Sequence, residues 1–285
     1  MATTSIQAPN LFNVDGLVAV ITGGGSGIGL MMARALALNG AHKVYIVGRR
    51  KEVLEKAAQS VSTHNIIPLV GDVTSKDALA SIVSTITSEV GYINLLIANS
   101  GTLGPQKTKA LTAESTIADF QEAYGQTSFE DFSKTFELNT VAVWYTIVAF
   151  LGLLDAGNKK GNVVQKSQVI ATSSIGGFNR NAPGGYGYGQ SKAATTHMMK
   201  QLATGLAPFG IRSNILAPGL FPSELASGII GDGVFSRTQI PLERVGTEED
   251  MAGCILFLTS RAGAYVTGNV MIIDGGRLSL NPATY

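Results

Sequence analysis

The sequence predicts a single α/β domain in which about seven parallel strands form a doubly wound sheet with helices on both faces. Short apolar runs rich in β-branched residues alternate with longer stretches of helical spacing along the 285 residues, which is the pattern of repeated β-α units. Right-handed crossovers between such units place helices on both faces of the sheet. No internal repeat or linker divides the chain, so we expect one domain over residues 1–285.

Seven apolar runs are the predicted strands, and most are continuous, as expected for strands buried on both faces. They are residues 17–22, 44–47, 66–70, 95–98, 169–172, 211–216 and 270–273. Apolar residues at helical spacing predict helices between them, at residues 27–39, 51–61, 76–89, 131–154, 190–206 and 248–259.

Two long connections interrupt this alternation, at residues 101–130 and at about residues 220–240. Loops of this length are usually functional or mobile, and we expect the second to form a lid. The predicted core covers about residues 17–276 and follows a short N-terminal extension.

Composition and charge exclude several classes of protein. Apolar residues make up 45% and charged residues 14% of the chain, unlike a disordered protein. Lys and Arg number 21 against 20 Asp and Glu, so neither a nucleic-acid partner nor a polybasic membrane surface is predicted. The single Cys254 excludes an internal disulfide and cysteine-based zinc sites, and the three histidines fit no metal spacing, so we expect no metal.

The N-terminus is polar, and no run reaches the ~18 apolar residues of a membrane span. The nearest, residues 140–154, favours a buried or subunit-facing helix. We therefore expect a cytoplasmic protein that does not bind a membrane.

A glycine-rich segment, TGGGSGIG at residues 22–29, joins the first predicted strand to the first predicted helix. Glycines let a backbone approach a pyrophosphate, and the helix N-terminus offers free N–H groups. The spacing is GxxxGxG rather than GxGxxG, and a tight glycine turn is the alternative. We favour dinucleotide binding in a Rossmann-type domain, through Gly23, Gly25, Ser26, Gly27, Ile28 and Gly29.

Two arginines, Arg49 and Arg50, follow the second predicted strand. An acidic residue there would bind the ribose 2′-hydroxyl of a nucleotide, whereas arginine accommodates a 2′-phosphate. We therefore favour NADP(H) over NAD(H); the alternative is that both arginines are solvated at the start of a surface helix. Asp72, after the third strand, either accepts a hydrogen bond from adenine or caps the following turn.

Tyr188 and Lys192 lie four residues apart on a predicted helix and therefore share one face. A lysine ammonium near a phenol favours the phenolate, so we expect the pKa of Tyr188 to be lowered toward neutrality. Such a phenol suits carbonyl–alcohol interconversion. An ordinary surface pair is the alternative, but the motif follows the strand end at Ser173 and Ser174.

Together, these motifs resemble the short-chain dehydrogenase/reductase family over about residues 17–276. The resemblance includes TGGGSGIG, GDV at residues 71–73, ANSG at residues 98–101, Asn139 in ELN, Ser174, Tyr188, Lys192, Pro218-Gly219 and IDGG at residues 273–276. The segment PGLFPSE and the long stretch after ANSG resemble fungal reductases akin to 3-oxoacyl-carrier-protein reductases.

This resemblance implies a catalytic role for four residues. Tyr188 would be the general acid or base, and Lys192 would hold the nicotinamide ribose and lower the pKa of Tyr188. Ser174 would hydrogen-bond the substrate carbonyl, with Ser173 as the competing register. Asn139 would bend its helix and hold a water that links Lys192 to solvent.

The resemblance also implies further cofactor contacts, at Asp72, Val73, Asn99, Gly101, Tyr188, Lys192, Pro218, Gly219, Leu220 and Ser223. Ala98 stands where the family has asparagine, and Ser223 stands where it has threonine but keeps a hydroxyl. Tyr186 is the other nearby phenol, but no lysine stands four residues after it.

We expect an NADP(H)-dependent oxidoreductase of secondary metabolism that reduces a neutral, hydrophobic carbonyl substrate. Few charges converge on the predicted pocket, whose apolar walls are Leu103, Phe178, Phe221, Leu225, Ile229, Ile230 and Phe235. The alternatives are imine reduction or cyclisation at the same site, and a non-catalytic NADP-sensing protein. The family resemblance further implies a homo-oligomer, a tetramer or a dimer, joined through the helix that carries Trp144 and Tyr145.

Overall fold

A computed structural model describes residues 6–285 and contains one seven-stranded sheet in which all neighbouring strands are parallel. The strands are β1 Val18–Thr22, β2 Lys43–Gly48, β3 Ile66–Val70, β4 Leu95–Ala98, β5 Gln168–Thr172, β6 Arg212–Pro218 and β7 Val270–Ile273. Their order across the sheet is β3-β2-β1-β4-β5-β6-β7. This order confirms the predicted doubly wound α/β fold.

The strand order reverses between β1 and β4, which are adjacent in the sheet. In such sheets a crevice opens at the carboxyl ends of the strands on either side of the reversal, and ligands bind there. The five residues of β1 and the four of β4 are all buried, as the continuous apolar runs predict. The fold therefore directs the residues after β1, β4 and β5 toward one site.

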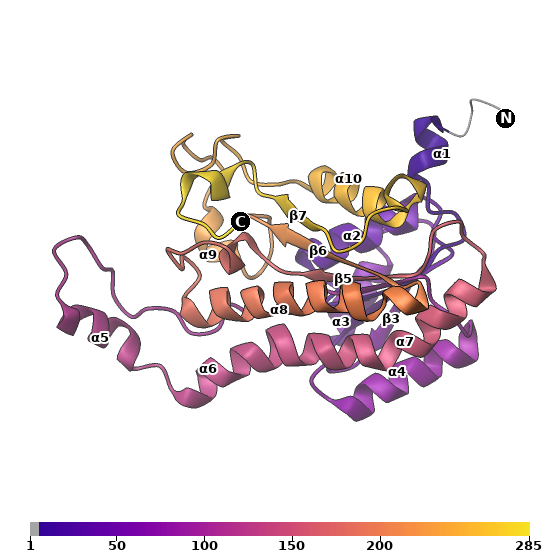
Figure 1. Cartoon of the computed structure of the whole chain (residues 1–285), viewed down its shortest axis with the longest axis horizontal. Coiled ribbons are helices and arrows are strands. Elements are labelled where there is room, and N and C mark those ends of the chain that lie inside the picture. The colour runs from indigo at the N-terminus through magenta and orange to yellow at the C-terminus, as the bar shows by residue number, and fades with distance from the viewer. Residues whose placement is uncertain (1–5) are drawn as a thin grey trace.

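Helices cover both faces of the sheet (Figure 1). They are α1 Ala8–Phe12, α2 Gly27–Leu38, α3 Lys51–Ala58, α4 Lys76–Glu89, α5 Ile117–Gly125, α6 Phe129–Phe136, α7 Ala142–Lys160, α8 Tyr186–Gly205, α9 Ser227–Ile230 and α10 Glu248–Thr259. One apolar cluster joins α4, α7 and α8 to the sheet, and a second joins α2, α3 and α10 to its opposite face. These two clusters are the core.

The helix predicted at residues 131–154 is longer than expected and is interrupted. It runs as α6, a π-helical turn at Glu137–Val141, and α7. The whole segment, residues 129–160, is long and apolar enough to cross a membrane by length and composition. However, Ile147, Phe150 and Leu154 are fully buried against the sheet, so the segment is a core helix of this fold.

The two long connections contain structure that the sequence pattern does not reveal. Residues 101–130 include α5, which lies on a segment projecting from the body of the molecule in Figure 1. A reciprocal capping box between Thr116 and Asp119 begins α5, and Lys109 pairs with Asp119 and Glu122. Residues 220–240, the predicted lid, include the short α9. The N-terminal extension contains α1, and its first five residues lie outside the described part.

Candidate active site

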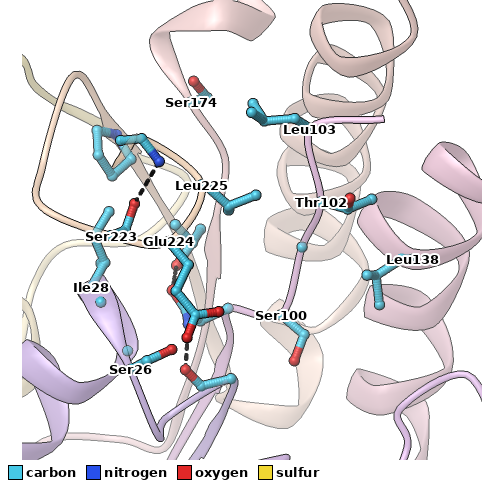
Figure 2. A pocket seen from close by; sticks show the side chains of 18 of the residues that line it. Ser26, Ile28, Ser100, Thr102, Leu103, Leu138, Ser174, Ser223, Glu224 and Leu225 are labelled. Atoms are coloured by element: carbon cyan, nitrogen blue, oxygen red, sulfur yellow. Dashed lines mark hydrogen bonds between the residues drawn. The ribbon is translucent and has the colours of Figure 1, made fainter. Parts of the chain in front are cut away.

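A cleft of about 940 Å³ opens at the carboxyl ends of the strands. Every residue predicted to contact the cofactor lines it, as do the predicted catalytic residues Ser174, Tyr188 and Lys192; Asn139 does not. Figure 2 shows Ser174, Leu103 and Leu225 toward one end of this cleft and Ser26 and Ile28 toward the other. The glycine-rich turn and the residues predicted for proton transfer therefore share one continuous space.

The glycine-rich turn lies between β1 and α2, as predicted. Gly23 and Gly27 have positive φ angles of 64° and 51°, which glycine adopts without steric cost. A Cβ at Gly29 would lie 2.2 Å from the Gly23 carbonyl oxygen, so glycine is required there for close packing. The Ser26 side chain does not cap α2, and the first N–H groups of the helix remain available to an anion.

Asn99 ties the ends of three strands together behind this turn. Its Nδ2 donates to the carbonyl oxygens of Thr22 at 3.1 Å and Gly23 at 3.3 Å, and its Oδ1 accepts from Thr172 Oγ1 at 3.0 Å. Thr22 Oγ1 in turn accepts the backbone N–H groups of Asn99 and Ser100. These bonds fix the floor of the cleft where β1, β4 and β5 end.

The two arginines after β2 lie at the opposite end from Ser174, and each faces an acidic side chain. Arg49 Nη1 lies 4.0 Å from Asp72 Oδ2, and Arg50 Nη2 donates to both carboxylate oxygens of Glu224, at 2.8 and 3.0 Å. Glu224 belongs to the predicted lid, residues 220–240, and points into the cleft in Figure 2. An ion pair thus joins this segment to the start of α3.

Asp72 acts within its own turn. Its Oδ1 accepts from the backbone N–H of Thr74 at 2.9 Å and from the Thr74 hydroxyl at 2.8 Å. The bond from the Thr74 N–H is the main cause that lowers the pKa of the Asp72 carboxyl. The turn cap given by the sequence is therefore present, and a hydrogen bond from adenine to Asp72 stays a prediction.

Tyr188 lies in the first turn of α8, which begins four residues earlier than predicted. A Cβ at Gly184 would lie 2.8 Å from Tyr188 Cδ1, and one at Gly176 would lie 3.1 Å from Cε1. Two glycines therefore leave the space that the Tyr188 ring fills. Tyr186 points elsewhere, because its ring packs against Tyr124 with centroids 5.2 Å apart, and it does not line the cleft.

The two serines after β5 have different surroundings. The Ser174 hydroxyl lies near the Tyr188 phenol and acts to lower its pKa, and its Oγ accepts from the Gly176 N–H at 3.0 Å. Ser173 Oγ instead donates to the Lys192 carbonyl at 3.0 Å and lies 2.6 Å from Thr196 Oγ1. Ser173 therefore anchors α8, and Ser174 is the serine beside the phenol.

Lys192 is buried, and its Nζ donates to the Thr172 carbonyl oxygen at 2.8 Å. Burial lowers the pKa of Lys192 to about 8.

Lys192 Nζ lies 6.0 Å from the centre of the Tyr188 ring. Burial raises the pKa of Tyr188, and the Ser174 hydroxyl opposes this more weakly. We expected Lys192 to lower the pKa of Tyr188, and this prediction is wrong for the protein without a bound ligand. Burial removes water from the phenol, and this effect is larger than any lowering by nearby groups.

Asn139 lies in the π-helical turn, so the expected break in its helix is present. Its Oδ1 accepts from the Thr102 N–H at 2.8 Å, and its Nδ2 donates to the Thr102 carbonyl at 2.9 Å and to Ser191 Oγ at 3.0 Å. A Cβ at Gly101 would lie 3.1 Å from Asn139 Oδ1 and 3.3 Å from Lys192 Nζ. Asn139 does not line the cleft, and Gly101 packs closely against both Asn139 Oδ1 and Lys192 Nζ.

The predicted apolar walls are partly correct. Leu103, Phe221, Leu225 and Ile229 line the cleft, whereas Phe178, Ile230 and Phe235 do not. Phe178 is buried, with its ring 5.2 Å from that of Tyr285, because the C-terminal segment folds back over the residues after β5. The structure adds Lys134, Glu137, Leu138, Pro183, Gly184 and Arg277 to the lining. The pocket lining therefore contains more charged residues than we expected, because Lys134, Glu137 and Arg277 belong to it.

Residues 23–277 match the family model described as enoyl-(acyl carrier protein) reductase. The chain belongs to the short-chain dehydrogenase/reductase family, as its motifs indicated. It is 53% identical to the short-chain dehydrogenase/reductase PhomF of Diaporthe leptostromiformis, over 99% of this chain and 98% of that protein.

Two solved structures show the same fold. RhlG of Pseudomonas aeruginosa, in an NADP active-site complex, superposes with a TM-score of 0.80 at 29% identity and covers 95% of this chain and 100% of that one. The 3-ketoacyl-(acyl-carrier-protein) reductase of Brucella melitensis, complexed with NADH, superposes with a TM-score of 0.76 at 26% identity over 93% and 99%.

Proposed function

We propose that this protein is an NADP(H)-dependent oxidoreductase that interconverts a ketone or aldehyde and an alcohol, and that its favoured reaction is the reduction of a largely apolar carbonyl compound. The observation that carries the proposal is the cleft itself. Its one end holds a buried phenol beside a serine hydroxyl, and its other end holds a glycine-rich helix N-terminus followed by two arginines.

The residues present fit a nicotinamide dinucleotide. Gly23 to Gly29 offer a close backbone and unpaired N–H groups to a pyrophosphate, and Arg49 and Arg50 offer cations to a 2′-phosphate. RhlG was solved with NADP and the Brucella reductase with NADH, so the arginines are our reason for favouring NADP(H). When bound, the nicotinamide supplies the hydride that reaches the carbonyl carbon.

Side chains of this protein would bind the substrate carbonyl oxygen and transfer a proton to it. Ser174 Oγ would donate a hydrogen bond to the substrate carbonyl oxygen, which gains negative charge during reduction. Tyr188 would give its proton to that oxygen, and would take a proton from the alcohol in the reverse direction. A phenol with a raised pKa holds its proton at neutral pH, and this protonation state is the one that reduction requires.

Lys192 would hold the nicotinamide ribose and place a positive charge near the phenol. The bond from Nζ to the Thr172 carbonyl fixes the ammonium, and a pKa of about 8 allows it to exchange protons near neutrality. Gly101 packs against both groups, since a Cβ there would lie 3.3 Å from Nζ and 3.1 Å from Asn139 Oδ1. We place beside these groups the water through which Asn139 would connect Lys192 to solvent.

We further propose a cytoplasmic homo-oligomer, a tetramer or a dimer. Trp144, Tyr145 and Val148 expose between 38% and 43% of their surface on α7, on the helix that the family resemblance assigns to subunit contacts. The fungal relative supports a place in secondary metabolism.

The test is the consumption of NADPH, followed by absorbance with a panel of apolar ketones and aldehydes. Substrate-dependent oxidation of NADPH supports the proposal. Binding of NADPH without turnover of any ketone, aldehyde or imine in the panel would favour the NADP-sensing alternative. Turnover of imines alone would show that the reaction is imine reduction, at the same site.

A further inference from the structure

Two arginines that are partly buried in this chain differ in how their charge is accommodated. Arg212 Nη1 lies within hydrogen-bond distance of Gln168 Oε1 at 3.2 Å and of the carbonyl oxygens of Leu258, Gly263 and Val266 at 3.0–3.3 Å. Arg277 Nη1 is also buried, yet it has no hydrogen-bond partner within residues 6–285. A buried donor without an acceptor costs free energy, so an unpaired guanidinium nitrogen needs a reason.

Arg277 lines the cleft. It begins a short 3-10 turn, Arg277–Leu280, directly after β7 and two glycines. Its neighbour Leu278 is buried in the same apolar cluster as Ile175, which follows Ser174. Strands β5, β6 and β7 are adjacent, and their carboxyl ends lie on the other side of β1 from β2, the strand that Arg49 follows.

The acidic group closest in sequence does not form an ion pair with this arginine. Asp274 Oδ1 accepts from the Gly276 N–H at 2.9 Å, and Oδ2 accepts from the Leu278 N–H at 2.6 Å. In the described part of the chain, no carboxylate lies within 4.0 Å of the Arg277 guanidinium. Lys134, the lining cation from α6, is already paired with Glu130 at 2.7 Å.

We infer that Arg277 binds a carboxylate on the substrate, so that the preferred substrate is an oxo acid: a largely apolar carbonyl compound with one carboxylate distant from the reacting carbonyl. Guanidinium is the side chain whose planar donors match a carboxylate. Leu103, Leu225 and Ile229 would contact the apolar part. The carboxylate would pair with the guanidinium, which lines the cleft. Nη1 is enclosed, so the guanidinium would turn toward the carboxylate to use that nitrogen. The oxidoreductase step rests on the proposed function, whereas the binding of a carboxylate does not.

Two measurements test this separately. The first compares the binding of phenylacetate and of phenylacetamide by calorimetry, with and without NADPH. The second compares kcat/KM for aryl keto acids of increasing chain length with that for their methyl esters. Each uses the unaltered protein, Arg277→Gln, Arg277→Lys and, as a matched control, Lys134→Gln, which removes a cation of the same wall that is already paired.

We expect the carboxylate probe to bind about tenfold more tightly than the amide, and the best keto acid to exceed its ester by about tenfold in kcat/KM. Arg277→Gln should abolish both preferences by raising Kd and KM with little change in kcat. Arg277→Lys should restore part of them, and Lys134→Gln should retain both.

The inference is overturned if neither probe pair shows a carboxylate preference, or if Arg277→Gln lowers only the melting temperature and leaves the preference intact. Reduction of esters and acids at equal rates would overturn the inference while the proposed function stands. Arg277-dependent binding of phenylacetate, without any reduction, would leave the carboxylate site in place and refute the proposed function.

Discussion

The two ends of the cleft are built differently. At the catalytic end, Asn139 is fully buried and makes three side-chain hydrogen bonds, and Lys192 and Ser173 are each fixed by backbone carbonyls. At the other end, the Arg49 side chain is 76% exposed and meets a single carboxylate at 4.0 Å. Under the proposed function, the fold would fix the geometry for proton transfer, whereas a few exposed charges that can change without disturbing the core would determine the choice of cofactor.

The largest effect should come from the catalytic end. Tyr188→Phe removes the proton donor and keeps the ring, so kcat should fall by at least about 100-fold, while the Kd for NADPH stays within about twofold of the unaltered protein. Tyr186→Phe is the matched control, because that ring packs against Tyr124 outside the cleft, and it should leave kcat unchanged. A kcat that is retained in Tyr188→Phe would contradict the assignment of Tyr188 as the proton donor.

The burial of Lys192 should appear in the pH dependence of stability. Folding lowers the pKa of Lys192 from 10.5 to about 8, so the folded state binds fewer protons than the unfolded state between these values. The free energy of unfolding should therefore rise by about 2 kcal/mol from pH 8 to pH 10 through this group.

Denaturant unfolding at the two pH values, compared between the unaltered protein and Lys192→Met, measures that contribution. The rise attributable to Lys192 should be absent from the variant. Parallel pH profiles for the two proteins would contradict the predicted low pKa.

A smaller effect should follow from crowding the Tyr188 ring. The methyl group of Gly184→Ala would meet Tyr188 Cδ1 at 2.8 Å, and the ring must shift by a few tenths of an ångström. We expect kcat to fall about tenfold with the Kd for NADPH retained. Gly205→Ala, at the far end of α8 where a Cβ meets nothing within 4 Å, should leave kcat unchanged; a similar loss there would indicate a general disturbance of α8.

The smallest effect should come from the exposed end. Glu224 is bound to Arg50 at 2.8 and 3.0 Å, so under the proposed function it would compete with a 2′-phosphate for this arginine. Glu224→Gln should tighten NADPH binding by about threefold, the scale of an exposed ion pair, and should leave NADH binding unchanged. Fluorescence titration at low salt measures both. If Glu224→Gln tightened NADH binding by the same factor, the Arg50–Glu224 pair would affect access to the cleft and not the binding of the 2′-phosphate.

The sequence predicts the sheet well because most strands are continuous apolar runs. The glycine turn and the Tyr188–Lys192 pair are recognised from the spacing of residues close together in the chain. The sequence does not reveal α5, whose stability comes from the Thr116–Asp119 capping box and from packing of Tyr124 on Tyr186. The raised pKa of Tyr188 was also missed, because burial depends on the whole fold.

Arg277 was missed for a different reason. It follows the last family motif by one residue, and only the adjacency of β5, β6 and β7 brings it to the cleft. The ion pair between Arg50 and Glu224 likewise joins residues 174 positions apart, a contact that no spacing rule contains.

The central claim is that the cleft holds NADP(H) with its 2′-phosphate at the arginine end. Titration with NADPH and with NADH, followed by fluorescence in the unaltered protein and in Arg49→Ala and Arg50→Ala, tests it most directly. We predict that NADPH binds more tightly than NADH, and that either substitution weakens NADPH binding alone. Equal affinity for the two dinucleotides, unchanged in both variants, would contradict the claim.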